Sequence, residues 1–467
     1  MENFTALGTF WLPGSENAAR AGTLVFDAAE RNTIVLRIAG SFEDGLAMVH
    51  DASQSYPVVF GVLETGRQVT LTGVLKISSS LNIKEVTVNP VTLLAHWILM
   101  GGHFPEGLDT KFPDFTFDFD RLDEWALALR PSNVSLDEIT EGGVTRFGVG
   151  GPDETAFSAF GGRVQVHIGS SVSSSANVFR AERSATLSYV PMQPMSPPEL
   201  VEGVMTPLNQ FIEFANGRPI HLSKLAAHHP PNDKELKEGV VLPAFIDIAF
   251  SGWRPPNSDE GYHTPSLPLI AMKDKEAELL ERWMDLHGRA REAFGLIFSI
   301  SSGPSLYLET RFLLAIQGLE VMHRRLLPGR ALESEELQER IEAAESSTED
   351  PQIKAWFGSK LQFAGEKTLR VRLKEMLQMI GEPGRFVGSS FVSKAVTTRN
   401  FYTHYDSTSG DPEQGQALHY LTLQVLSVFD LFLLNQLGYG NEEAVYVFGQ
   451  SLRARELTYQ KSVSAQG

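Results

Sequence analysis

The sequence predicts an α+β multidomain protein, with a β-rich N-terminal domain followed by an all-helical domain. The chain has 467 residues, more than one hydrophobic core usually organises. Apolar residues alternate with a period of two in the first part and recur with a period of 3.6 from about Lys273 onward. Between the two parts, Trp253–Pro268 contains four prolines, as linkers often do. We therefore expect domains at 1–265 and 270–467.

In the N-terminal part, short segments rich in β-branched residues are separated by Gly, Asn, Asp and Ser, which is the pattern of strands joined by turns. Such a series predicts a curved sandwich or an open barrel. One helix is expected over Pro198–Ala215, after a proline-rich entry. The expected strands are Thr23–Phe26, Thr33–Ile38, Val58–Leu63, Val69–Leu75, Val144–Phe147, Gly162–Ile168, Ser184–Tyr189 and Val240–Phe250.

The C-terminal part has helical periodicity interrupted by short breaks of Gly, Pro and Ser. Its most apolar segment, Leu421–Leu434, contains Gln424 and Asp430, so we expect a buried helix there rather than a membrane span. The expected helices are 273–300, 305–327, 333–346, 351–380, 390–406, 414–437 and 441–455.

Composition excludes several classes of site. The chain has no cysteine, which rules out disulfides, thiolate zinc sites and cysteine nucleophiles. A net charge of −17 argues against a general nucleic-acid coat protein. Residues 351–400 nevertheless hold nine basic and three acidic side chains, which suits a phosphate backbone and equally a solvated basic helix face. No secretory signal is visible in Met1–Gly8, so we expect a cytoplasmic protein without membrane attachment.

The most informative motif is Arg399-Asn400-Phe401-Tyr402-Thr403-His404, near the end of an expected helix. An arginine can neutralise a phosphorane, and an imidazole can move a proton near neutral pH, so the pair is suited to cleaving RNA without a metal. The spacing alone is weak, because the composition yields about one Arg-x4-His pair by chance. A second pair is Arg282 and His287.

The expected helix also bears on the role of the motif. Arg399 falls near the middle of an apolar stripe, so it either pairs with a buried carboxylate or faces an interface. His404 lies about 140° further round the helix, and the two side chains meet one phosphate only if the last turn loosens before Ser407–Pro412. In a purely structural alternative, Arg399 pairs with Glu320 or Glu309. The stripe consists of Phe391, Val392, Ala395, Val396 and Tyr402.

RNA carries its own nucleophile in the 2′-hydroxyl, so a protein must supply a base, an acid and positive charge. One copy of the motif supplies one histidine. A two-fold dimer that brings two motifs face to face would supply both proton-transfer groups. The sequence therefore suggests a homodimer as the catalytic unit.

Two regions resemble parts of a known family. The helix Glu309–Arg325 and the later Arg399-Asn400-x3-His404 are similar to the HEPN domain of ApeA proteins. The N-terminal part resembles the domain that precedes HEPN in that family, from Gly8–Pro13 and Gly22-Thr-Leu to Gly217–Leu222. The resemblance implies a HEPN endoribonuclease of bacterial anti-phage defence that needs no metal or other cofactor. Such an enzyme cuts host or phage RNA, often tRNA or another structured RNA, and leaves a 2′,3′-cyclic phosphate.

Carried over by position, Arg399 and His404 match the catalytic pair of the family, and Asn400 matches the polar residue that often follows the arginine. Glu320 is carried over as a residue that orients Arg399. The family has no catalytic pair in its entry helix, so we expect Arg282–His287 to be a solvated face. The resemblance also implies that the N-terminal domain senses an unidentified phage trigger or restrains the nuclease.

The segment Phe112–Trp125 alternates aromatic residues with Asp114, Asp118 and Asp120. Two of these could be a glycosidase acid and nucleophile, or oxygen ligands for calcium. We expect an edge strand whose acidic residues face water.

Two further patterns are expected to be turns rather than functional sites. We expect His228-His229-Pro230-Pro231 to be an exposed turn rather than a metal site. Gly148–Gly151 lacks the helix start of a dinucleotide loop and is expected to be a turn. Two other functions stay open: a non-catalytic HEPN protein that dimerises or binds nucleotide beside a ligand-binding β domain, and a carbohydrate-active β domain.

Overall fold

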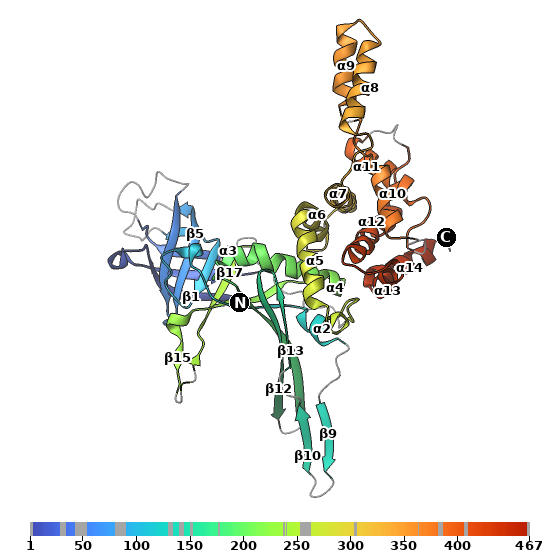
Figure 1. The fold of residues 1–467 in the computed structure, drawn as a ribbon. Coiled ribbons are helices and arrows are strands. Elements are labelled where there is room, and N and C mark those ends of the chain that lie inside the picture. Colours follow the sequence, from blue (N-terminus) through green and yellow to red (C-terminus); the bar gives the residue numbers. More distant parts are fainter. Residues whose placement is uncertain are drawn as a thin grey trace. The chain divides into compact units, whose positions relative to one another are not determined.

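The computed structural model describes residues 3–28, 34–42, 54–79, 90–128, 134–139, 144–149, 153–175, 178–236, 239, 241–252, 263–302, 306–362, 364–381, 386–405 and 410–464. They form two compact units (Figure 1). The first comprises Met1–Ala215, Ile220–Thr264 and Pro268–Leu280, and the second comprises Asn216–Pro219, Pro265–Leu267 and Glu281–Gly467. Much of the predicted linker Trp253–Pro268 lies outside the described residues.

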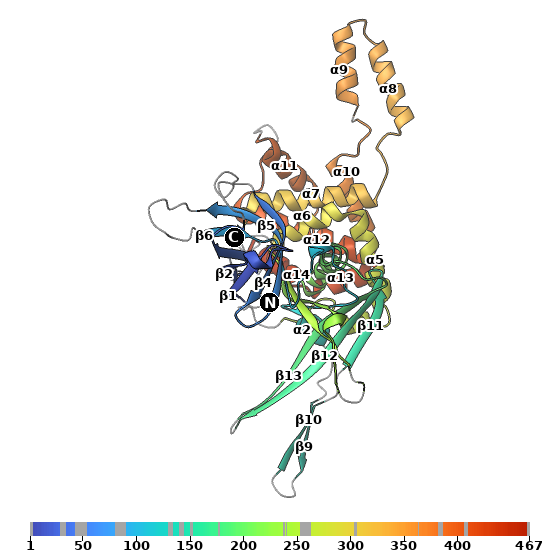
Figure 2. The same ribbon diagram turned by 90° about the vertical axis from the view of Figure 1, so that its left-hand side faces the viewer.

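The first unit is β-rich, as predicted, and its main sheet has thirteen strands in the order β11-β12-β13-β8-β14-β17-β7-β5-β4-β1-β2-β3-β6. Strand β6 pairs with both β3 and β5, so β1, β2, β3, β6, β5 and β4 close into a six-stranded barrel. Figures 1 and 2 show this barrel and the strands that continue the sheet beyond it. The predicted fold class is confirmed, and the pairing of β5 with β6 closes the barrel.

The strands of the barrel and its extension are β1 (Phe4–Trp11), β2 (Arg20–Phe26), β3 (Ile34–Ala39), β4 (Ser55–Leu63), β5 (Gln68–Ser79), β6 (Pro90–Leu94), β7 (Trp97–Met100), β8 (Phe115–Phe119), β11 (Asp153–Ala159), β12 (Gly162–Ser175), β13 (Val178–Pro191), β14 (Leu222–His228) and β17 (Phe245–Phe250). Two separate hairpins are formed by β9 (Val134–Ile139) with β10 (Val144–Val149) and by β15 (Lys234–Glu235) with β16 (Val241–Leu242). Gly148 and Val149 belong to β10 rather than to the predicted turn, and the remainder of that motif lies outside the described residues.

Alternation along the strands builds the barrel core. In β3, Ile34, Leu36 and Ile38 are buried while the residues between them are more exposed. Phe10 is fully buried and lies against the backbone of Gly61, where a Cβ atom would stand only 2.4 Å from its ring. Glycine at position 61 therefore admits a large ring to the core.

Strand β8 corrects one prediction. It lies between β13 and β14 inside the sheet, so the expectation of an edge strand was wrong. Phe115, Phe117 and Phe119 are buried, as their alternation suggested. The neighbours that cover β8 come from distant parts of the chain, and local alternation does not show which strands pair.

The predicted helix Pro198–Ala215 is present with an irregularity. It begins as α3 (Pro197–Leu200), continues through a π-helical turn at Val201–Met205 and ends as α4 (Thr206–Asn216). At its start, Ser196 and Glu199 form a capping box, in which each side chain satisfies a backbone N–H of the first turn. The short helix α2 (Leu122–Leu127) also belongs to this unit.

The second unit is helical, as predicted. Three predicted helices are each divided in two, because short turns at Ala290, around Gly365 and at Gln450–Ser451 interrupt the periodicity. The helices are α5 (Glu276–Arg289), which begins in the first unit, α6 (Arg291–Ser302), α7 (Leu308–Leu326), α8 (Ser334–Ser346), α9 (Pro351–Leu361), α10 (Leu369–Met379), α11 (Phe391–His404), α12 (Gly415–Gln436), α13 (Asn441–Gly449) and α14 (Leu452–Ser464).

Helix α12 is the centre of the bundle. The run from Leu421 to Leu434 is buried, so the predicted buried helix is confirmed. By length and composition this is the one helix in the described parts of the chain that could cross a membrane, but 78% of its most apolar stretch is buried within the protein. Phe429 meets Phe294 and Phe298 of α6, which gives the bundle an aromatic core.

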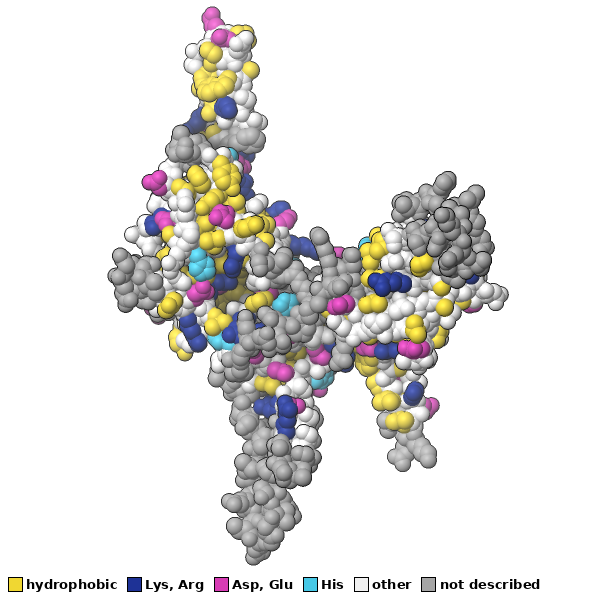
Figure 3. All heavy atoms as spheres, turned by 180° about the vertical axis from the view of Figure 1, so that it is seen from behind, with side chains coloured by type: hydrophobic (Ala, Val, Ile, Leu, Met, Phe, Trp, Pro, Cys, Tyr) yellow, Lys and Arg dark blue, Asp and Glu magenta, His cyan; other side chains and the backbone are white. Residues whose placement is uncertain are grey.

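Helices α8 and α9 form a hairpin that projects from the rest of the helical unit (Figures 1 and 2). Only Leu337 of the two helices is buried, among the residues described. Ile353 and Trp356 are exposed on α9, and hydrophobic side chains are visible on the hairpin in Figure 3.

Candidate functional site

The Arg-x4-His motif lies on α11, which packs against α7, α10 and α12. Phe391, Ala395, Thr398 and Tyr402 are the buried residues of this helix. Their spacing of four, three and four is that of one helical face. Arg399 follows Thr398 and therefore borders this face. The prediction that it lies near the middle of the apolar stripe was wrong. Its side chain is 33% exposed.

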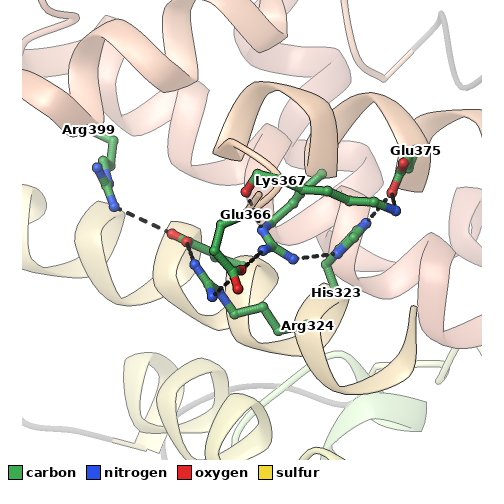
Figure 4. Close-up of polar contacts among 8 residues, drawn as sticks. His323, Arg324, Glu366, Lys367, Glu375 and Arg399 are labelled. Carbon is green, nitrogen blue, oxygen red and sulfur yellow. Dashed lines mark hydrogen bonds and ion pairs between the residues drawn. The ribbon is translucent and has the colours of Figure 1, made fainter. Parts of the chain in front are cut away.

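Arg399 has two polar partners. Its Nη2 atom donates to Oε2 of Glu320 on α7 over 3.5 Å, and its Nη1 atom donates to Oδ1 of Asn400 over 3.2 Å. Of the two carboxylates weighed for Arg399, Glu320 is the one in contact. These contacts hold the guanidinium, and a third of the Arg399 side chain stays open to solvent. Figure 4 shows Arg399 pointing toward α7.

His404 is the last residue of α11 and is exposed. The helix stays regular up to this residue, so Arg399 and His404 remain about 140° apart around its axis. The side chains of Arg399 and His404, both within the described residues, do not bond to each other. The loosened last turn that would bring them to one phosphate is not formed here, and residues 407–409 of the predicted loop lie outside the described residues.

The residue after the motif is a feature that sequence analysis missed. Tyr405 ends α11 with a φ of 51°, in the left-handed region, and its side chain is 73% exposed. A non-glycine residue in this conformation is strained. The ring of Tyr405 lies 5.9 Å from that of Phe401 and beside His404 in sequence. Glu413, which precedes α12, is held against α11. Its N–H donates to the hydroxyl of Thr398, and its carbonyl accepts from the hydroxyl of Tyr402.

A second missed feature is a chain of charged groups behind Glu320 (Figure 4). Arg324, one turn further along α7, donates to Oε1 of Glu320 over 3.0 Å. Arg324 also contacts Glu366, which precedes α10. The i, i+4 spacing of Glu320 and Arg324 was visible in the sequence, but only the fold brings Glu366 to them.

The local excess of positive charge is partly internal. Lys367, Arg372, Lys394 and Arg399 are each ion-paired with a glutamate. Four other cations of the same stretch are exposed and make no ion pair within the described residues; these are Lys354, Lys360, Arg370 and Lys374. Of these four residues, Arg370 and Lys374 are nearest to Arg399 in sequence, and they lie one turn apart on α10. They are the candidates for contacts with a phosphate backbone.

The expectation that Arg282 and His287 form a solvated face holds for Arg282, which is exposed, and is wrong for His287. His287 is buried against Phe294, and this burial lowers the pKa of the imidazole to about 4, with a smaller effect of Arg291. Arg282 donates to the carbonyl of Leu437 over 3.0 Å. The periodicity of α5 did not show that the side of the helix bearing His287 is covered, because the covering residues follow later in the chain.

The histidines at the end of β14 are not an exposed turn. The His228 ring lies between two carboxylates, with Nδ1 2.8 Å from Asp114 and Nε2 2.9 Å from Asp233. Burial lowers the pKa of His228, but hydrogen bonds to these carboxylates outweigh it, so the pKa is raised overall. The two contacts tie β14 to Asp114, which precedes β8, and to the segment around Asp233.

Asp118 and Asp120 each have partners of their own. Asp120 accepts from the backbone N–H of His221 over 2.8 Å and has a nearly buried side chain. Burial raises the pKa of Asp118, which also contacts Thr186. In the parts of the chain that the structure describes, no group of three His, Asp or Glu residues is placed to hold a metal ion.

Comparison with known proteins adds two matches. The family model ApeA N-terminal domain 1 matches residues 5–283, and the model Apea-like HEPN matches residues 313–443. The second match contains Glu320, Arg399, Asn400 and His404. No curated protein and no solved structure gave a match.

Proposed function

Because this chain belongs to the ApeA family of anti-phage defence proteins, we propose that it is a metal-independent endoribonuclease that uses Arg399 and His404. HEPN domains are in general ribonucleases. The observation that supports the proposal most is the state of Arg399. Glu320 and Asn400 hold its guanidinium, yet a third of the side chain remains open to a substrate.

In the proposed reaction, the 2′-oxygen of a nucleotide attacks the adjacent phosphorus, and the bond from phosphorus to the 5′-oxygen breaks. The products are a 2′,3′-cyclic phosphate and a 5′-hydroxyl. Arg399 neutralises the charge that develops on the phosphoryl oxygens, and Asn400, whose carbonyl accepts from Arg399, presents its amide N–H groups to the same phosphate. His404 takes the proton of the 2′-hydroxyl or returns one to the 5′-oxygen.

A single chain supplies one exposed imidazole at this helix end, so we propose a homodimer in which His404 of a second copy completes the acid–base pair. Tyr405 offers an exposed ring beside His404 on which an unstacked base can lie. Arg370 and Lys374 on α10 supply contacts for the phosphate backbone. The substrate class is thus a structured RNA with an unpaired segment, such as tRNA, from host or phage.

The β-rich unit is proposed to respond to the phage trigger, and the reaction to take place in the cytoplasm. The active nuclease would then stop growth of the infected cell. This division of roles follows from membership of the family. It predicts that protein purified without the phage trigger can be inactive.

The direct test uses purified full-length protein, labelled tRNA and EDTA. We expect cleavage that resists EDTA, yields a 2′,3′-cyclic phosphate end and disappears in His404→Ala. His419→Ala is the matched control, because His419 is a partly exposed histidine that pairs with Glu456 on α14. Equal cleavage by wild type and His404→Ala would show a contaminating nuclease.

A latent enzyme is tested better in cells. Expression of the wild-type chain with phage challenge should arrest growth, and Arg399→Ala should relieve the arrest, while Arg340→Ala on the exposed face of α8 should not. If Arg399→Ala and His404→Ala both protect as well as wild type, the bundle is a non-catalytic dimerisation or nucleotide-binding module.

A further inference from the structure

The charged groups behind Arg399 form one continuous chain that runs from α11 through α7 to α10 (Figure 4). Glu320 connects Arg399 with Arg324, and Glu366 connects Arg324 with Arg372 at 3.2 and 3.1 Å. Each carboxylate therefore lies between two guanidinium groups. The chain ends in His323, Glu375 and Lys367.

The inner end of this chain is fixed. Arg372 is 3% exposed and donates to three different residues. Its Nε donates to the carbonyl of Lys367, its Nη1 to Nδ1 of His323 and its Nη2 to Glu366. Since a guanidinium can only donate, Nδ1 of His323 must accept. The proton of a neutral His323 is then on Nε2, which donates to Glu375 over 2.7 Å.

Burial supports this neutral form, because it lowers the pKa of His323, whereas Glu375 acts in the opposite direction. Every group around Arg372 thus has a defined donor or acceptor role. The rigid planar fork of Arg372 sets where the Glu366 carboxylate can lie.

Glu366 is also positioned by its backbone. The preceding Gly365 accepts a hydrogen bond from the N–H of Ala331 over 2.8 Å, at the base of the α8–α9 hairpin. A Cβ at residue 365 would come within 3.0 Å of Leu337 and 3.1 Å of the Leu332 carbonyl. The side chain of Glu366 therefore starts from a closely packed position. It accepts from Nη1 of Arg324, whereas Glu320 accepts from Nη2.

We infer that Glu366 is a positioning residue of the nuclease site, acting through Arg324. With Glu366 present, Arg324 shares its charge between two carboxylates, and Glu320 keeps an oxygen for Arg399. Without it, Glu320 is the only carboxylate that contacts Arg324 among the residues described. Arg324 then draws both oxygens of Glu320, and Arg399 loses its anchor on α7. This inference rests on the proposed ribonuclease function.

The test is a double-mutant cycle on RNA cleavage by the full-length protein. Glu366→Gln should lower kcat about tenfold with KM within about twofold, and should have no further effect in an Arg324→Gln background. Glu336→Gln is the matched control, because it removes an exposed Glu–Arg pair on α8 with the same change of charge and should leave kcat unchanged. A wild-type kcat for Glu366→Gln, or an equal loss in both backgrounds, overturns the inference.

Two additions keep the test decisive. If Glu366→Gln unfolds because Arg372 loses its counter-charge, Glu366→Asp keeps that charge but withdraws it from Arg324, and the same loss of kcat is expected. If wild-type protein neither cleaves RNA nor arrests growth under phage challenge, the proposed function fails. Whenever no cleavage can be measured, Tm decides the inference separately. The loss of Tm in the double variant Glu366→Gln/Arg399→Gln should be smaller than the sum of the losses in the two single variants. A loss equal to that sum overturns the inference.

Discussion

Glu320 and Arg399 are 79 positions apart in the sequence, yet the carboxylate of the first lies 3.5 Å from the guanidinium of the second. The contact joins α7 to α11, two helices of the second unit that pack together. A third of Arg399 remains exposed, so the contact orients the guanidinium without sealing it off. The following predictions depend on this arrangement and on its surroundings.

Replacing Glu320 by glutamine keeps the shape of the side chain and removes its charge. We expect Glu320→Gln to lower kcat about tenfold, equivalent to about 1.4 kcal/mol of transition-state stabilisation, because Arg399 is less well oriented. KM should change little. Steady-state cleavage of labelled tRNA measures both constants, with Glu339→Gln on exposed α8 as the control. An unchanged kcat would mean that the carboxylate does not orient Arg399.

Removing the exposed ring of Tyr405 should affect binding more than chemistry. Stacking of a base on an aromatic side chain contributes about 1–3 kcal/mol, so Tyr405→Ala should raise KM at least fivefold while kcat stays near the wild-type value. Tyr459→Ala is the matched control, because Tyr459 is also an exposed tyrosine and lies on α14. If both variants bind RNA equally well, no base stacks on Tyr405.

The stability of the protein should fall in mild acid because of His287. Its folded pKa of about 4 is below the unfolded value near 6.5, so the unfolded chain binds the proton more readily. Stability is therefore complete above pH 6.5 and decreases as pH falls toward 4, by up to about 3 kcal/mol from this group. His287→Gln should flatten the pH dependence of urea unfolding between pH 7 and 4.5.

His419→Gln serves as the control for this measurement, because His419 is partly exposed. If His287→Gln and the wild-type protein lose stability in parallel over the same range, His287 is not the group that titrates.

The ion pair between Asp430 and Arg453 should stabilise the bundle, because Asp430 lies in the buried core helix α12. Arg453→Met leaves a buried carboxylate without its counter-charge, which costs about 3–5 kcal/mol. Burial raises the pKa of Asp430 and Arg453 opposes this, so the variant should be least stable, relative to wild type, at high pH. Urea unfolding at pH 6 and 8 checks both statements. Arg340→Met, at an exposed pair, should stay within about 0.5 kcal/mol of wild type.

The fold class and the order of its parts could be predicted from local patterns. Alternation in segments such as Val69–Leu75 and helical periodicity after Lys273 report the burial of one face, which is a property of a short stretch of chain. The burial of Leu421–Leu434 followed in the same way. The divisions at Ala290 and Gln450–Ser451 were missed because one or two residues change the apolar periodicity too little to be detected. The break between Leu361 and Leu369 is longer and was also missed.

The sequence by itself determined that a guanidinium and an imidazole are placed five residues apart near the end of one helix, and that Asn400 follows the arginine. Tertiary structure alone decided the surroundings: Glu320 contacts Arg399, Glu366 contacts Arg324, His287 is buried and β8 is an inner strand. The physical reason is that helical and strand periods are set by neighbouring residues, whereas ion pairing, burial and strand pairing depend on packing between segments that the chain separates by tens of positions.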